Sequence, residues 1–271
     1  MKKMSEQSLE QKMQSLEKLV DSYGKEIEKQ KILQECTKVF SMYEAVHIPS
    51  LMCRTAEEVF ALWRDDVSME VSDWGIFRGP EAVKFLFEDI MLEDQIGTIM
   101  EHHLDTPYVE VAGDLKTAKA TWWSSGMESV FDPARTDLKE TQAKCVWSWG
   151  KYAVDFIQNP ETGIWRIWHL KWFRTFRVNY YKSWIDDWKQ MNISDGFPKG
   201  KALEAMEAAG IKKGDTTFHR PYRVDAMRHP FPWPPKPYET YNGDFQWWYN
   251  DEEGFRDKYS ADIAIMPIPE D

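Results

Sequence analysis

The stretch TIMEHHLDTPYVEVAGDLKTAKATWW, residues 98–123, decides the predicted fold, because it describes two strands joined by a turn. Residues 109–112 alternate in polarity, residues 113–114 are turn formers, and residues 117–123 begin a second strand. His102 and His103 are adjacent in the first strand, where successive side chains face opposite sides of a sheet. Only one of them can therefore face a given interior, where a histidine can act as a general acid or base near neutral pH.

Helices are predicted ahead of this stretch. Residues 9–27 carry apolar side chains at an alternating spacing of four and three, and residues 32–43 continue as an amphipathic helix that ends before Pro49. We expect this stripe to pack on a partner subunit or on the body of the protein. A helix over residues 55–63, with Thr55 as its N-cap, is predicted next, followed by one over residues 81–91 that opens with a proline in its first turn.

Strands dominate the middle of the chain. One is predicted over residues 67–77, and four long ones over residues 99–112, 117–130, 143–157 and 163–177. Helices followed by a run of antiparallel strands indicate the α+β class.

The chain divides into three predicted parts: an N-terminal amphipathic helix (1–29), a domain (30–191) and a C-terminal arm rich in proline and aromatic residues (192–271). Short helices are predicted over residues 183–191 and 201–209. The prolines between residues 221 and 235 exclude a central strand or helix there. We expect an ordered arm that wraps over the body or over a neighbouring subunit.

Composition excludes several classes of function. A net charge of −11 without a basic run argues against nucleic-acid binding. No apolar stretch reaches the roughly 20 residues that span a bilayer, and no secretory signal is present. Cys36, Cys53 and Cys145 are scattered, which suits reduced thiols in a cytoplasmic protein. No His-x-His pair, Cys/His cluster or nucleotide-binding motif is present, so we predict neither a metal nor a cofactor, and chemistry limited to proton transfer.

Three groups of segments together resemble the SnoaL-like branch of the nuclear transport factor 2-like superfamily, over about residues 30–180. The first is FALWRDDV (60–67) with GIFRGPEAV (75–83); the second is HHL (102–104) with VEVAGD (109–114) and the following Thr117-Ala118; the third is YAVDF (152–156) with GIWRI (163–167). The resemblance implies a cone-shaped α+β barrel, in which a curved antiparallel sheet wraps around helices and encloses one pocket. It also implies a dimer or trimer. The superfamily contains scytalone dehydratase, bile-acid 7α-dehydratase and diarylpropane lyase, and also non-catalytic proteins.

The resemblance assigns candidate catalytic residues. His102 occupies the position of the dehydratase histidine, and His103 stays a candidate because a register slip of one residue would exchange the two. Tyr43 and Glu44 match a tyrosine and aspartate pair, with glutamate in place of aspartate. His47 lies one helical turn past Tyr43 and shares its face.

Further candidates come from the strands. His169 and Lys171 alternate on the last strand and would enter the site if their face is the inner one, and Asp155 is another carboxylate that an ion pair would explain equally well. Aromatic side chains and one acid are plausible walls for an aromatic ligand; they are Asp73, Trp74, Trp123, Trp147 and Trp149.

The leading hypothesis is a cofactor-independent lyase, of the dehydratase or side-chain-cleaving kind, acting on a hydroxylated aromatic or polycyclic small molecule. The first alternative is an isomerase or polyketide cyclase on the same fold, with Glu44 or Asp155 as base. The second is a non-catalytic ligand-binding or assembly protein, in which the helical stripe and the arm are the main features.

Overall fold

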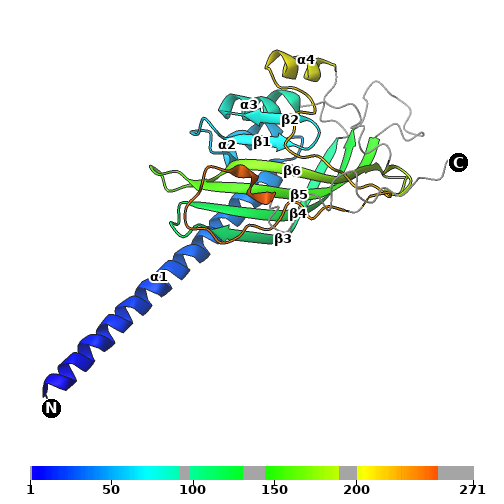
Figure 1. Ribbon diagram of the computed structural model, residues 1–271. Coiled ribbons are helices and arrows are strands. Elements are labelled where there is room, and N and C mark those ends of the chain that lie inside the picture. Colours follow the sequence, from blue (N-terminus) through cyan, green and yellow to red (C-terminus); the bar gives the residue numbers. More distant parts are fainter. Residues whose placement is uncertain (1, 92–97, 131–143, 189–199, 227, 250–271) are drawn as a thin grey trace.

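The computed structural model describes residues 2–91, 98–130, 144–188, 200–226 and 228–249. Its centre is one curved, six-stranded sheet with the order β2-β1-β6-β5-β4-β3 (Figure 1). The strands are β1 Ser68–Val71, β2 Gly75–Arg78, β3 Ile99–Val111, β4 Thr117–Val130, β5 Lys144–Gln158 and β6 Trp165–Asn179. The α-helices are α1 Lys2–Val46, α2 Thr55–Val59, α3 Pro80–Phe85 and α4 Lys201–Ala208. A π-helical turn, Leu86–Ile90, extends α3, and short 3-10 turns occupy Met52–Arg54 and Phe245–Trp248. The predicted α+β class and the cone-shaped fold are confirmed.

The sheet is mixed, and not purely antiparallel as predicted. β1 pairs parallel with β6, while all other neighbours are antiparallel. Residues 67–77 were expected to form one strand, but a turn after Val71 splits them into the β1–β2 hairpin. The side chain of Ser72, at the start of this turn, donates to the carbonyl of Trp172, and this bond ties the hairpin to β6.

The prediction that Thr55 is the N-cap of α2 is also wrong. Thr55 already has helical dihedral angles (φ −57°, ψ −46°), because the preceding 3-10 turn leads directly into α2. Its hydroxyl donates to the carbonyl of Val46 at 3.3 Å, so it ties α2 to the end of α1. The prediction that Pro80 begins α3 is confirmed, as is the helix that ends before Gly210.

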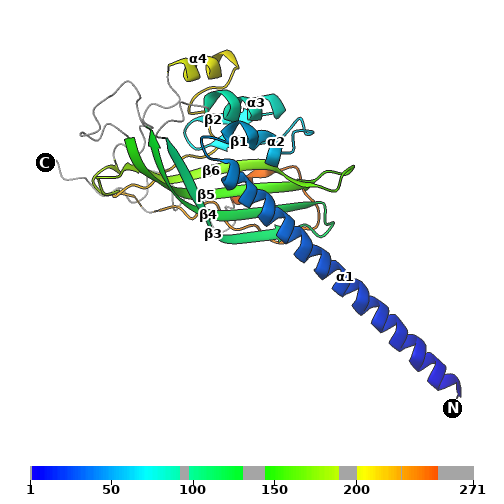
Figure 2. The ribbon, with the colours of Figure 1, turned by 180° about the vertical axis from the view of Figure 1, so that it is seen from behind.

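The second half of α1 forms the core with the inner face of the sheet. Phe40 is fully buried and contacts Trp122, Tyr152 and Phe156, with ring centroids 4.5–6.3 Å apart. Truncating a buried phenylalanine of this kind costs about 3–5 kcal/mol. The first half of α1 extends away from the body (Figures 1 and 2). No helix among the described residues is both long and apolar enough to cross a membrane.

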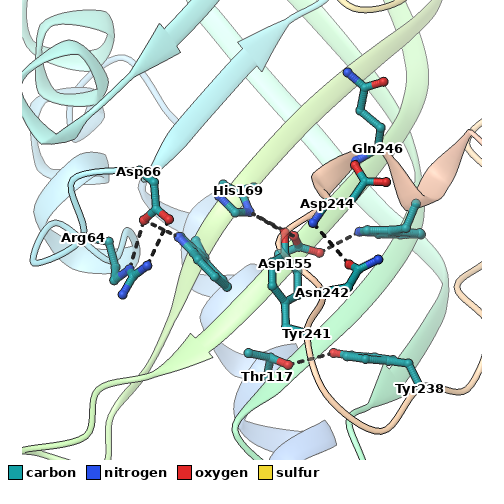
Figure 3. Close-up of polar contacts among 12 residues, drawn as sticks. Arg64, Asp66, Thr117, Asp155, His169, Tyr238, Tyr241, Asn242, Asp244 and Gln246 are labelled. Atoms are coloured by element: carbon teal, nitrogen blue, oxygen red, sulfur yellow. Dashed lines mark hydrogen bonds and ion pairs between the residues drawn. The ribbon is translucent and has the colours of Figure 1, made fainter.

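The described part of the arm covers the outer face of the sheet (Figure 3). Asp155 on β5 is fully buried and accepts hydrogen bonds from Tyr241 Oη (2.7 Å) and Trp247 Nε1 (2.7 Å). His169 Nδ1 on β6 lies 2.9 Å from the same carboxylate. A buried carboxylate needs such donors, so the arm completes the burial of this face.

We expect Tyr241→Phe to loosen the arm, because the variant removes one donor from the buried Asp155 carboxylate. Hydrogen bonds to charged groups contribute about 1.5–3 kcal/mol. The free energy of unfolding should fall by that amount, and limited proteolysis within residues 228–249 should become faster. Tyr181→Phe, at an exposed ring, is the matched control and should change neither. Equal behaviour of the two variants would contradict this role of Asp155.

Candidate active site

A pocket lies between the end of α1, the β1–β2 hairpin and the inner face of the sheet. Its cavity volume is about 50 Å³. It is lined by Tyr43, His47, Met69, Val71, Trp74, Met91, Met100, His102, Glu128, Tyr152, Trp172 and Arg174. The lining is therefore largely aromatic and apolar, with a few polar groups that converge on one side, as in sites for small molecules.

His102 lies in this pocket, and its side chain is 7% exposed. Its Nε2 is 3.3 Å from Glu128 Oε1, and Glu128 Oε2 is 2.8 Å from the guanidinium of Arg177. Burial lowers the pKa of His102, but Glu128 and Glu44 outweigh it, so that the pKa is raised. Burial acts to raise the pKa of Glu128, but Arg177 and His102 hold that pKa well below its usual range. Both shifts favour an imidazolium beside a carboxylate over a neutral pair.

Gly126 makes room for the imidazole. It is the partner of His102 in the β3–β4 register, and Glu128 is the diagonal neighbour two residues further along. A Cβ at Gly126 would lie 2.2 Å from His102 Cδ2. Any larger residue at this position would displace the ring from the pocket.

The end of α1 contributes the predicted Tyr43 and His47. Tyr43 is buried and stacks on His47, with ring centroids 4.9 Å apart, and the His47 ring lies 6.1 Å from that of His102. Burial, together with the charge of His102, lowers the pKa of His47 to about 3, so this ring stays neutral. Its Nδ1 is buried and has no hydrogen-bond partner within the described residues.

Glu44 lies beside the pocket and does not line it. Burial raises the pKa of its carboxyl to about 7, against the opposing effects of His102 and the Tyr152 hydroxyl. Its Oε1 is buried without a hydrogen-bond partner in the described part of the chain. Glu44 therefore acts on the pocket through its charge and through Tyr152.

Further aromatic and charged side chains lie in or beside the pocket. The Trp172 ring lies 5.9 Å from that of His102 and contacts Tyr152 at 4.5 Å. Asp73, which the sequence placed in the site, forms an ion pair with Arg174 at the pocket edge. Trp74 lines the pocket.

Several residues that the sequence predicted for the site lie outside the pocket. His169 and Lys171 are on the outer face of β6, because the inner positions of that strand are Leu170, Trp172 and Arg174. His169 contacts Asp155 under the arm, and Lys171 forms an ion pair with Glu70.

Strand alternation removes a second group of residues in the same way. Trp123 and Trp149 are 40% and 44% exposed, and Trp147 stacks on Tyr180. His103 is exposed, on the face of β3 opposite to His102. For β4 and β5 the sequence pattern did not choose the inner face, whereas for β3 the family resemblance already favoured His102.

The sequence interpretation missed Glu128, Tyr152, Arg174 and Arg177. Glu128 was the most accessible to prediction, since it shares its face of β4 with the buried Trp122 and a lone acid on such a face needs a partner. Arg174 and Arg177 are an odd number of positions apart and both reach the inner face because the β5–β6 register shifts between Trp149 and Gly150. That shift has no clear signature in the sequence.

The site has few features of a metal centre. Glu44 and His47 are three residues apart on α1, but no group of three or more potential ligands that could hold a metal ion occurs among the described residues. The available chemistry of these side chains is proton transfer and charge stabilisation.

Residues 53–171 match the model of the SnoaL-like domain family. The chain contains a SnoaL-like domain. The match spans the β1–β2 hairpin, β3 with His102, and β4 with Glu128, and the resemblance found in the sequence is confirmed. No match was found among curated proteins.

Solved structures similar to the SnoaL-like domain include a type 2 hexachlorocyclohexane dehydrochlorinase (LinA), with 11% identity, coverage of 58% of this chain and 95% of that one, and a TM-score of 0.45. A nuclear transport factor 2-like protein from Salmonella enterica has 19% identity, coverage of 57% and 99%, and a TM-score of 0.40. An NTF2-like protein with a cystatin-like fold from Novosphingobium aromaticivorans has 16% identity, coverage of 58% and 87%, and a TM-score of 0.37.

We expect Gly126→Ala to push the His102 ring away from Glu128. The pKa of His102, followed by NMR titration of its ring protons, should fall toward the ordinary value of about 6.5. Overpacking of this kind should also cost about 1–3 kcal/mol of stability. Ser125→Ala, one residue away on the outer face, is the control. An unchanged His102 pKa in Gly126→Ala would contradict the proposed fit.

The pair of His102 and Glu128 also predicts how stability depends on pH. A histidine whose pKa is raised on folding contributes stability that is complete below its unfolded pKa of about 6.5 and is lost as pH rises through the folded pKa. The difference in unfolding free energy between the wild type and His102→Asn, measured in urea, should therefore shrink as pH rises above about 6.5. His103→Asn should show no such trend, and a pH-independent difference for His102→Asn would contradict the ion pair.

Proposed function

We propose that the protein is a cofactor-independent lyase, of the dehydratase or side-chain-cleaving kind, which acts on a hydroxylated aromatic or polycyclic small molecule. One observation carries the proposal: a buried histidine, His102, whose Nε2 lies 3.3 Å from a Glu128 carboxylate oxygen, faces a pocket lined by aromatic rings. The SnoaL-like domain supports an enzyme of this general kind.

His102 is the acid and the base of the proposed reaction. The imidazolium donates its proton to the hydroxyl that leaves, and the carbon–oxygen bond breaks as electrons move in from the aromatic ring. The neutral imidazole then removes a proton from the adjacent carbon, so that an alkene and water are formed and the imidazolium is restored. Glu128 stabilises the charged form at the start and at the end of this cycle.

The other pocket residues orient the substrate. Tyr43 and the neutral His47 offer hydrogen bonds to a substrate oxygen, and the rings of Trp74 and Trp172 suit a flat ligand. A hydroxyl para to the reacting carbon delocalises the developing positive charge, which is why an aromatic pocket favours this chemistry.

An isomerase or cyclase is the second candidate, and the raised pKa of Glu44 favours it. A carboxylate with a pKa of about 7 is a suitable base for moving a proton next to a carbonyl. Because Glu44 does not line the pocket, this reaction requires its side chain to turn toward the substrate. Asp155 no longer serves this alternative, because it is buried under the arm on the other face.

The test uses a secondary alcohol that carries a para-hydroxyphenyl ring, with its meta isomer as the matched probe. The wild type should release one water from the para compound, detected by mass spectrometry, at least about tenfold faster than from the meta isomer. His102→Asn should lower kcat by about 10²–10⁴-fold, and His103→Asn should stay within about twofold of the wild type.

Full activity of His102→Asn would overturn the assignment of the histidine. Loss of activity in Glu44→Gln with little effect of His102→Asn would instead support the isomerase type of site. Absence of water release from both probes would contradict the dehydratase reaction.

A further inference from the structure

The first half of α1 exposes a continuous apolar stripe. The side chains are between 55% and 66% exposed and follow the spacing 4-3-4-3-4: Leu9, Met13, Leu16, Val20, Tyr23 and Ile27. Leu19, beside the stripe, is 46% exposed. Large apolar side chains gathered on one face of a helix that extends from the body mark an interaction surface (Figures 1 and 2).

We propose that this stripe binds the same stripe of a second copy of the chain, in a parallel, in-register, two-stranded coiled coil over residues 9–27. The spacing places Met13, Val20 and Ile27 at heptad position a, and Leu9, Leu16 and Tyr23 at position d. β-branched residues at a, combined with leucine at d, favour two parallel strands. This preference is met by Val20 and Ile27 at position a and by Leu9 and Leu16 at position d.

Charges beside the stripe are complementary in this arrangement. In a parallel dimer a residue at position g lies near the residue five positions later, at position e, of the other copy. Lys12 then faces Glu17 of the second copy, and Glu26 faces Lys31 of the second copy. Lys31 also pairs with Glu28 of its own helix at 3.1 Å, an exposed contact of little stability that does not compete strongly.

An antiparallel dimer satisfies these charges less well. In an antiparallel pair, position a of one helix packs against position d of the other. With the two stripes fully overlapped, Glu17 then lies opposite Glu17 of the second copy. The parallel arrangement has no such like-charged pair at its e and g positions between residues 12 and 31.

The body of the protein leaves this surface free. The residues of α1 that pack into the body, Ile32, Cys36, Val39 and Tyr43, occupy heptad positions f, c, f and c, which are on the side of the helix opposite to a and d. The next positions of the stripe are Gln30 and Gln34, both polar and exposed, so the seam ends at Ile27. Two bodies can therefore lie on the outer sides of the pair.

The experiment measures the molar mass of the full chain by light scattering after size exclusion, and its dissociation constant by sedimentation. Val20→Asp, at the centre of the seam, should halve the mass of the particle without changing the thermal unfolding of the domain. Lys12→Glu and Glu17→Lys should each weaken association roughly tenfold, since each turns two attractive pairs into two repulsive ones.

The double variant Lys12→Glu/Glu17→Lys should restore the wild-type dissociation constant to within about threefold. Lys18→Glu makes the same charge change at the outer position f and is the control, expected to have little effect. A wild type that is monomeric at about 50 μM, a mass that Val20→Asp leaves unchanged, or a double variant that does not recover would each overturn the proposal. The last result would indicate an antiparallel pair or a different partner.

Discussion

The contact between the second half of α1 and the inner face of the curved sheet is the interaction on which the other features depend. Phe40 is surrounded by rings from β4 and β5, and Tyr43 follows it by one helical turn. Because this helix is held in the concave face, its last turn brings Tyr43 and His47 to His102 on β3. The same contact leaves the first half of α1 without a place on the body, so that its apolar stripe stays exposed.

Burial of charge in the pocket is tolerated because the charges form a chain. The Glu128 carboxylate lies 2.8 Å from the Arg177 guanidinium and 3.3 Å from His102 Nε2. Each charge in this row is therefore offset by its neighbour. A single buried charge would shift its pKa and become neutral. His47 does this, since burial together with the charge of His102 keeps it uncharged. The two histidines therefore have opposite protonation preferences, which gives the pocket one proton donor and one neutral partner.

The outer face of the sheet solves a different problem. Its polar residues, such as Asp155, would be exposed or would need water if the arm did not cover them. The arm supplies tyrosine and tryptophan donors from residues far away in sequence (Figure 3). His169 has a carboxylate partner there and resembles half of a catalytic pair, yet it lies on the side away from the pocket. A histidine with a carboxylate partner is therefore not enough to locate a site.

The sequence by itself determined the elements and the residue types available for chemistry. The order of helices and strands and the helical stripe were predicted from local patterns, because periodicity and turn formers act over a few residues. Tyr43 and His102 came from the resemblance to the SnoaL-like family, and His47 from its place one helical turn past Tyr43. Tertiary structure decided which face of each strand is the inner one. Val109 and Val111 face the core, and strict alternation from them would turn His103 inward; a bulge between Asp105 and Tyr108 adds one residue to β3 and turns His102 inward instead. Pro107, which lacks a backbone N–H, interrupts the ladder at that point. Glu128, Arg174 and Arg177 reach the inner face for a similar reason, because the register between neighbouring strands places them there. That register depends on pairing between strands and cannot be read from one strand alone.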